Sequence, residues 1–218
     1  MRGGFLSALT GLGVIGLVLQ AHLPAFLNDA RAASSKNKAW PCIQRKVPEL
    51  SAATIWTGPA VRKDDSVWAK NSTIAALVKA TTSRRNTIEQ AKAEIDSFAA
   101  TLKDDTALRL TQLFSGQFAV INSERREIMA GIERYARRQQ ALSKAIKTSI
   151  GELNALTAKE SPNDADRRRM GELNEKLKWN TRIFDEREQS LKYVCDVPVL
   201  LEQRLFALGR HIMTHLPK

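Results

Sequence analysis

Two histidines near the C-terminus have a spacing that suits metal binding. His211 and His215 are four residues apart, so on a helix they share one face, where two imidazoles can bind one metal ion. The sequence indicates no third ligand, and the remaining histidine, His22, lies far upstream. The simpler interpretation is a solvated C-terminal helix, whose negative dipole end favours histidine side chains. We therefore expect no metal or other cofactor, and keep His211 and His215 as the only candidate pair.

Clustered arginines are the second feature with binding chemistry. A guanidinium presents a planar fork to phosphate or carboxylate, so such clusters could bind an anionic surface. The alternative is a basic face that only contacts solvent. No run of aromatic residues accompanies these arginines, and nucleic acid is therefore not an expected partner. The candidate binding residues are Arg126, Arg134, Arg137 and Arg138 in one segment, and the consecutive Arg167, Arg168 and Arg169 in another.

Catalytic motifs are absent from the chain after residue 32. We find no GxSxG, Walker loop, HExxH or GxGxxG pattern there. Acidic residues are dispersed among basic ones, as in "IFDEREQSLK", whereas acid–base catalysis needs carboxylates in an enclosed site that perturbs their pKa values. The sequence predicts a protein that is not an enzyme.

The first 32 residues have the pattern of a secretory signal peptide. Arg2 precedes an apolar stretch from Phe5 to Leu19, and Ala30 to Ala32 form a small-residue cleavage site before a polar segment. Pro24 and polar residues interrupt the apolar run, which falls short of the roughly 20 residues of a spanning helix. A retained membrane anchor is the alternative. We predict cleavage after Ala32 and a periplasmic protein.

Charge and cysteine content fit such an exported chain. The sequence has 34 basic and 23 acidic residues, a net charge of +11, which favours acidic protein faces or lipid head groups as partners, and peripheral membrane contact would be one form of this. Cys42 and Cys195 are its two cysteines. In an oxidising compartment two cysteines most often pair with each other. We predict a structural Cys42–Cys195 disulfide.

Heptad spacing dominates the second half of the chain and predicts a long antiparallel hairpin. Residues 106–158 carry a stripe with steps of four and three, which is typical of a left-handed coiled coil. A second such stripe follows the turn "KESPND", where we expect Ser161 as the N-cap and Pro162 at the first helical position. The heptad stripe does not show whether the helix that packs against it belongs to the same chain, so self-association is an alternative. Gln139 and Asn180 interrupt the stripes and are predicted to fix helix alignment.

Further helices are predicted on either side of the hairpin. Apolar residues at helical spacing indicate one helix over about 66–103. After Cys195, we expect Asp196 and Pro198 to start a new helix. The predicted helices are about 66–103, 106–158, 162–195 and 197–215, and together they make the bundle of residues 64–218. Three of the prolines fall within residues 33–63, which favours an extended strap with one short turn near "PELSAAT".

The expected fold is therefore all-α: an elongated antiparallel three- to four-helix bundle with a long coiled-coil-like hairpin and an N-terminal proline-containing strap. The leading functional hypothesis is an exported non-catalytic scaffold or adaptor that binds an envelope protein complex or an anionic surface. The alternative is a periplasmic holdase chaperone that binds unfolded clients. A metal-binding protein or an enzyme is the third option, and it would depend on His211 and His215.

Overall fold

A computed structural model describes residues 40–61 and 66–217, and within them all regular structure is helical. The predicted signal peptide, residues 1–32, lies outside the described residues. No helix among these residues has the length and apolar character needed to cross a membrane. The elements are η1 (Ala52–Thr54), α2 (Val67–Lys70), α3 (Ser72–Thr82), α4 (Ile88–Ala100), α5 (Thr106–Thr157) and α6 (Asp164–Met213).

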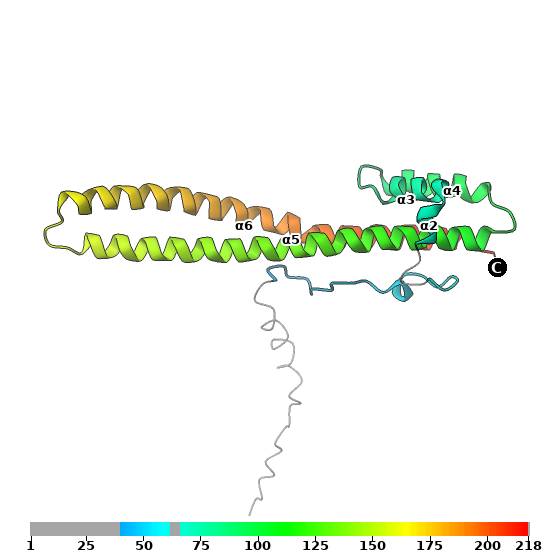
Figure 1. The fold of residues 1–218 in the computed structure, drawn as a ribbon, viewed down its shortest axis with the longest axis horizontal. Coiled ribbons are helices and arrows are strands. Elements are labelled where there is room, and N and C mark those ends of the chain that lie inside the picture. The colour runs from blue at the N-terminus through cyan, green and yellow to red at the C-terminus, as the bar shows by residue number, and fades with distance from the viewer. Residues whose placement is uncertain (1–39, 62–65, 218) are drawn as a thin grey trace, which may run out of the picture. The chain divides into compact units, whose positions relative to one another are not determined.

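Helices α5 and α6 form the predicted antiparallel hairpin, and they run side by side for most of their length (Figure 1). The all-α fold with an elongated hairpin is thereby confirmed. The turn between them ends in a capping box, in which the Asn163 side chain accepts from the Asp166 amide at 2.9 Å and Asp166 accepts from the Asn163 amide at 3.2 Å. Asn163 is thus the N-cap instead of Ser161, and Pro162 precedes the cap.

The single helix predicted over 66–103 is wrong, because α2, α3 and α4 divide this segment. Asn71 caps the start of α3 by accepting from the Ile74 amide at 3.1 Å. Thr87 and Gln90 form a capping box that begins α4. Between the two helices, the Asn86 side chain donates to the carbonyl of Ala80 at 3.0 Å. Side chains that hydrogen-bond free backbone groups therefore stabilise a break that apolar periodicity alone does not reveal.

The helix junction predicted at Cys195 and Asp196 is also wrong, because α6 continues through Pro198. A proline inside a helix cannot donate to the carbonyl four residues before it. Side chains from other segments contact the carbonyls around this point. Gln44 of the strap donates to the carbonyl of Cys195, and Arg125 Nε donates to that of Pro198 at 3.2 Å. The strap and α5 thus both donate hydrogen bonds to backbone carbonyls of α6 at or near Pro198.

The hydrophobic core lies at the end of the hairpin away from its turn, where α3 and α4 pack on α5 and α6 (Figure 1). Trp56 of the strap stacks on Phe114 of α5, with ring centroids 4.4 Å apart. We call this end the base. Its fully buried large side chains include Ile74, Ile95, Leu110, Leu113, Phe114, Ile121, Leu201, Leu205, Leu208 and Ile212.

The other end of the hairpin is a two-helix arm. We define the arm as residues 139–157 of α5 and 164–184 of α6. Its buried residues are only Gln139, Ser149 and Leu173. An isolated pair of helices can bury only the seam between them, so most of the arm surface stays open to solvent.

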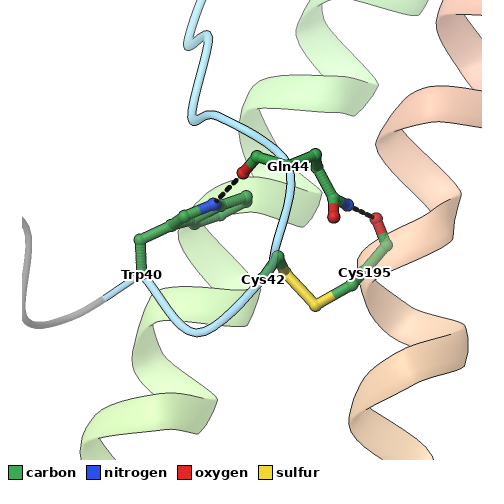
Figure 2. The surroundings of a disulfide bond; sticks show 4 residues. All are labelled: Trp40, Cys42, Gln44 and Cys195. Carbon is green, nitrogen blue, oxygen red and sulfur yellow. Dashed lines mark hydrogen bonds between the residues drawn. A yellow bond between two sulfur atoms is a disulfide. The ribbon is translucent and has the colours of Figure 1, made fainter. Parts of the chain in front are cut away.

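The predicted disulfide joins the strap to the middle of α6. Cys42 and Cys195 are bonded, 153 residues apart in sequence (Figure 2). Beside the bond, Trp40 Nε1 donates to the carbonyl of Gln44 at 2.7 Å (Figure 2). Further along, the Leu50 amide donates to Asn122 of α5 at 3.1 Å. The described part of the strap, residues 40–61, has one short 3-10 turn, η1, within the segment where the turn was predicted.

Candidate functional site

Exposed apolar side chains form a stripe along α6. Trp179 and Tyr193 have exposed fractions of 60% and 75%, and Leu200 one of 55%. Together with the more covered Ile183, they fall on positions reached by alternating steps of four and three, so they share one face of α6. Neighbouring positions, such as Leu173, face the seam instead. We call Trp179, Ile183, Tyr193 and Leu200 the outer stripe.

Three of the predicted binding arginines gather on one turn of α5. Arg134, Arg137 and Arg138 are exposed, and their spacing of three and four residues places them on one helix face. None of the three makes an ion pair within the described part of the chain. We call them the arginine cluster. Arg126, in contrast, lies 3.6 Å from Glu49 of the strap.

The arginines at the hairpin turn are largely paired with carboxylates. Arg167 contacts Asp164 at 2.7 Å. Arg169 donates to both oxygens of Glu152, at 2.6 and 3.1 Å, and this bond raises the pKa of the guanidinium. Arg168 is exposed. The structure thus does not join the two predicted groups, since Arg138 precedes the end of α5 by 19 residues, about 28 Å at the helical rise.

The histidine pair meets an acidic residue that sequence reasoning missed. His211 Nε2 and His215 Nε2 lie 2.6 and 2.7 Å from the same oxygen, Oδ1 of Asp96 in α4. The two imidazole rings meet edge to face, 5.3 Å apart. Desolvation acts to raise the pKa of Asp96, but the hydrogen bonds from His215 and His211 outweigh it and hold that pKa below its ordinary value.

Asp96 carries no local signal that links it to the histidines. It lies 115 residues before His211, on a helix that the sequence analysis placed within one longer element. Only the packing of α4 on α6 brings the three side chains together. Tertiary structure thus brings a carboxylate to the histidine pair, and spacing along the chain cannot show this contact.

A shallow depression between the long helices lies close to the disulfide. Its lining includes Tyr135 and Gln139 of α5, Phe184 and Leu191 of α6, and Pro41 of the strap. Tyr135 donates to the carbonyl of Arg187 at 2.7 Å and Gln139 to that of Phe184 at 2.8 Å. Tyr135 and Gln139 of this surface thus join α5 to α6.

No known family model, curated protein or solved structure matches this chain. Its function must therefore be inferred from its own surfaces and side chains.

Proposed function

We propose that this chain is an exported, non-catalytic scaffold or adaptor that binds an acidic surface of an envelope protein through its hairpin arm. The observation that carries the proposal is the exposure of Trp179, Ile183 and Tyr193 along one face of a helix whose other face is in the seam. Tryptophan, tyrosine and arginine are the residue types that most often dominate binding energy at protein interfaces. The outer stripe offers tryptophan and tyrosine, and the arginine cluster on α5 offers the third.

Charge favours an acidic partner. The chain carries a net charge of +11, and the arginine cluster has no carboxylate partner among the described residues. Complementary charge speeds the encounter of two proteins and selects against wrong partners. Apolar anchors on the outer stripe would then supply affinity, with the arginine cluster providing orientation.

A lipid surface is the weaker option for the arginines. A basic residue near an anionic membrane contributes about 1 kcal/mol, so the three residues of the arginine cluster would contribute about 3 kcal/mol. Such an energy gives only millimolar-scale binding or weaker. The arginines at the hairpin turn add little to this membrane attraction, since Arg167 and Arg169 are already paired with carboxylates.

The base would act as a fixed support for the arm. Its core holds four helices together, and the disulfide ties the strap to α6. A disulfide of this kind suits an oxidising compartment, in agreement with the predicted export to the periplasm.

Site-specific photocrosslinking in the exporting cell tests this proposal. A photoreactive amino acid replaces Trp179 in the arm and, as the control, Leu108, which is 57% exposed near the start of α5. We expect one stoichiometric envelope protein crosslinked from position 179 and absent from position 108. The purified partner should then bind Trp179→Ser at least tenfold more weakly than it binds Leu108→Ser.

Other crosslinking results would contradict the adaptor proposal. Identical products from both positions would mean that the arm has no specific role. Many unrelated, unfolded clients would favour the holdase, and suppression of aggregation by the purified chain would support it. Unimpaired partner binding by Arg134→Gln, Arg137→Gln and Arg138→Gln combined would remove the arginine cluster from the interface.

A further inference from the structure

We propose that Asp96, His211 and His215 form a binding site for one divalent transition-metal ion, with Zn²⁺ as the ion that fits best. The three side chains converge from two helices, and one ligand atom from each lies within 4.8 Å of the others. This site is separate from the hairpin arm, because Asp96 is in α4 and the histidines are at the end of α6.

The donor set selects the class of ion. Two imidazole nitrogens and one carboxylate oxygen suit borderline ions such as Zn²⁺, whereas Mg²⁺ and Ca²⁺ take oxygen ligands almost exclusively. Zinc commonly has three protein ligands of these types in an open site and takes water in the fourth position. Both histidines present Nε2 to the carboxylate, so the same nitrogen of each ring is placed toward a common point.

The ligand atoms need to move apart only slightly to admit a zinc ion. At zinc–ligand distances of about 2.1 Å, tetrahedral geometry separates neighbouring ligand atoms by about 3.4 Å. The present nitrogen–oxygen separations are 2.6 and 2.7 Å. Rotations about the side-chain bonds of three partly exposed residues are enough to widen them.

Core packing holds the three ligands in place. Asp96 follows Ile95 in α4 and His211 precedes Ile212 in α6, and both isoleucines are fully buried. His215 lies in the turn after α6, where its amide donates to the Ile212 carbonyl at 3.0 Å. A site whose ligands extend from well-packed elements loses less freedom when the ion binds. Metal binding would therefore join α4 to the end of α6 without rearranging either helix.

The site is also open to an incoming ion. The side chains of Asp96, His211 and His215 are 51%, 23% and 29% exposed. Partial exposure leaves an entry path and room for a water ligand.

Zinc titration of the full chain, exported and purified without a histidine tag, tests the site. Apart from His22 in the predicted signal peptide, His211 and His215 are the only histidines, so ring ¹⁵N resonances report on them directly. We expect one equivalent of Zn²⁺ to bind, to shift both sets of ring resonances and to raise the melting temperature. Co²⁺ substitution should give the visible spectrum of a four-coordinate site.

Two variants and one control separate a metal site from a hydrogen-bonded clamp. Asp96→Asn retains an oxygen that can accept from the histidines but is a poor zinc ligand, and we expect it to weaken Zn²⁺ binding at least tenfold. His211→Gln should also weaken Zn²⁺ binding at least tenfold, although its amide can still donate a hydrogen bond to Asp96. Glu89→Gln, an exposed position of α4, should bind like the unaltered chain.

The proposal is overturned if Zn²⁺ binds with less than one equivalent, or if Asp96→Asn and Glu89→Gln bind it equally well. Melting in the presence of a chelator shows whether each variant still folds. Should Asp96→Asn fail to fold, the comparison of His211→Gln with Glu89→Gln decides the question by the same criterion.

Discussion

Arg204 of α6 donates from Nε to the backbone carbonyl of Thr81 at 2.9 Å, in the last turn of α3. Its Nη1 also donates to the carbonyl of Asn86, at 2.9 Å, in the connection to α4. The side chain is buried, and desolvation lowers the pKa of the guanidinium. Carbonyls at the end of a helix need partners from elsewhere, and Arg204 provides two such hydrogen bonds at the point where α3 stops.

Replacing Arg204 should therefore destabilise the base. In Arg204→Met the carbonyls of Thr81 and Asn86 lose these donors, at a cost of about 1–3 kcal/mol for each buried group. We expect the free energy of unfolding, measured with urea, to fall by about 2–6 kcal/mol. Arg210→Met, at an exposed position of the same helix, should change it by less than about 0.5 kcal/mol. Equal effects of the two substitutions would contradict this role.

Two glycines of α5 should respond in opposite directions to alanine. A Cβ atom at Gly116 would lie 2.5 Å from Val78 and 2.8 Å from Trp68, whereas one at Gly151 would meet nothing within 4 Å. We expect Gly116→Ala to lower the free energy of unfolding by about 1–3 kcal/mol because of overpacking. Gly151→Ala should raise it by up to about 1 kcal/mol through helix propensity. Thermal unfolding of both variants checks the pair, and a stabilising Gly116→Ala would contradict the close approach of α3 to α5.

Gln139 should contribute more to alignment than to stability. Its amide nitrogen donates to Phe184, but its buried oxygen has no partner among the described residues. Changing Gln139 and Asn180 together to leucine should raise the melting temperature by a few degrees, since about 1 kcal/mol shifts it by roughly 2–4 °C for a chain of this size. Native mass spectrometry should then detect more than one oligomeric species. If the variant and the unaltered chain gave the same oligomeric species, the alignment role would be contradicted.

The hairpin turn should loosen in acid. The hydrogen bond from Arg169 lowers the pKa of Glu152, and the one from Lys159 lowers the pKa of Asp166. A lowered pKa in the folded state gives stability that is present above the ordinary values, 4.5 for Glu152 and 3.8 for Asp166, and is lost as the pH falls below them. Hydrogen exchange around residues 152–169, corrected for the intrinsic rate, should show less protection at pH 3 than at pH 7.

A matched variant tests the cause of that change. Arg169→Gln removes the partner of Glu152, so its turn should show reduced protection already at pH 7. If the turn of the unaltered chain kept full protection at pH 3, these ion pairs would have no role in holding it.

Loss of the Cys42–Cys195 bond should be the largest single change in stability. Closing a loop of this length, 153 residues of separation, corresponds to about 5 kcal/mol in the chain-entropy model. Urea unfolding with and without reductant measures the difference. The Cys42→Ser and Cys195→Ser double variant should match the reduced protein and should not respond to reductant. A difference below about 1 kcal/mol would show that the unfolded chain is already compact.

The parts of the fold that could be predicted from the sequence are those marked by a long repeat or by a single possible pairing. The heptad stripe of α5 fixed its bounds within one residue of those observed, 106–157. The Cys42–Cys195 pairing was inferred from the number of cysteines and the predicted oxidising compartment, and the disulfide is present in the structure. The heptad repeat extends over many turns of helix, and the chain has only two cysteines. The identity of single neighbouring residues therefore has little effect on either inference.

The errors arose where local and tertiary signals compete. The capping box of Thr87 and Gln90 is visible in the sequence, yet apolar periodicity continues across it and suggested one helix. Pro198 indicated a helix start, but α6 continues through it while Arg125 and Gln44 contact nearby carbonyls. Asp96 could not be linked to His211 and His215, because that contact exists only once α4 packs on α6.

The position of the disulfide also has a mechanical consequence. Because Cys42 is bonded to Cys195, tension between the N-terminal side of the strap and the C-terminus passes through the bond and the last part of α6. Residues 43–194, which include α3, α4, α5 and the whole arm, lie outside that load path. A pull on the two ends would therefore leave the arm unstretched until the sulfur–sulfur bond is reduced.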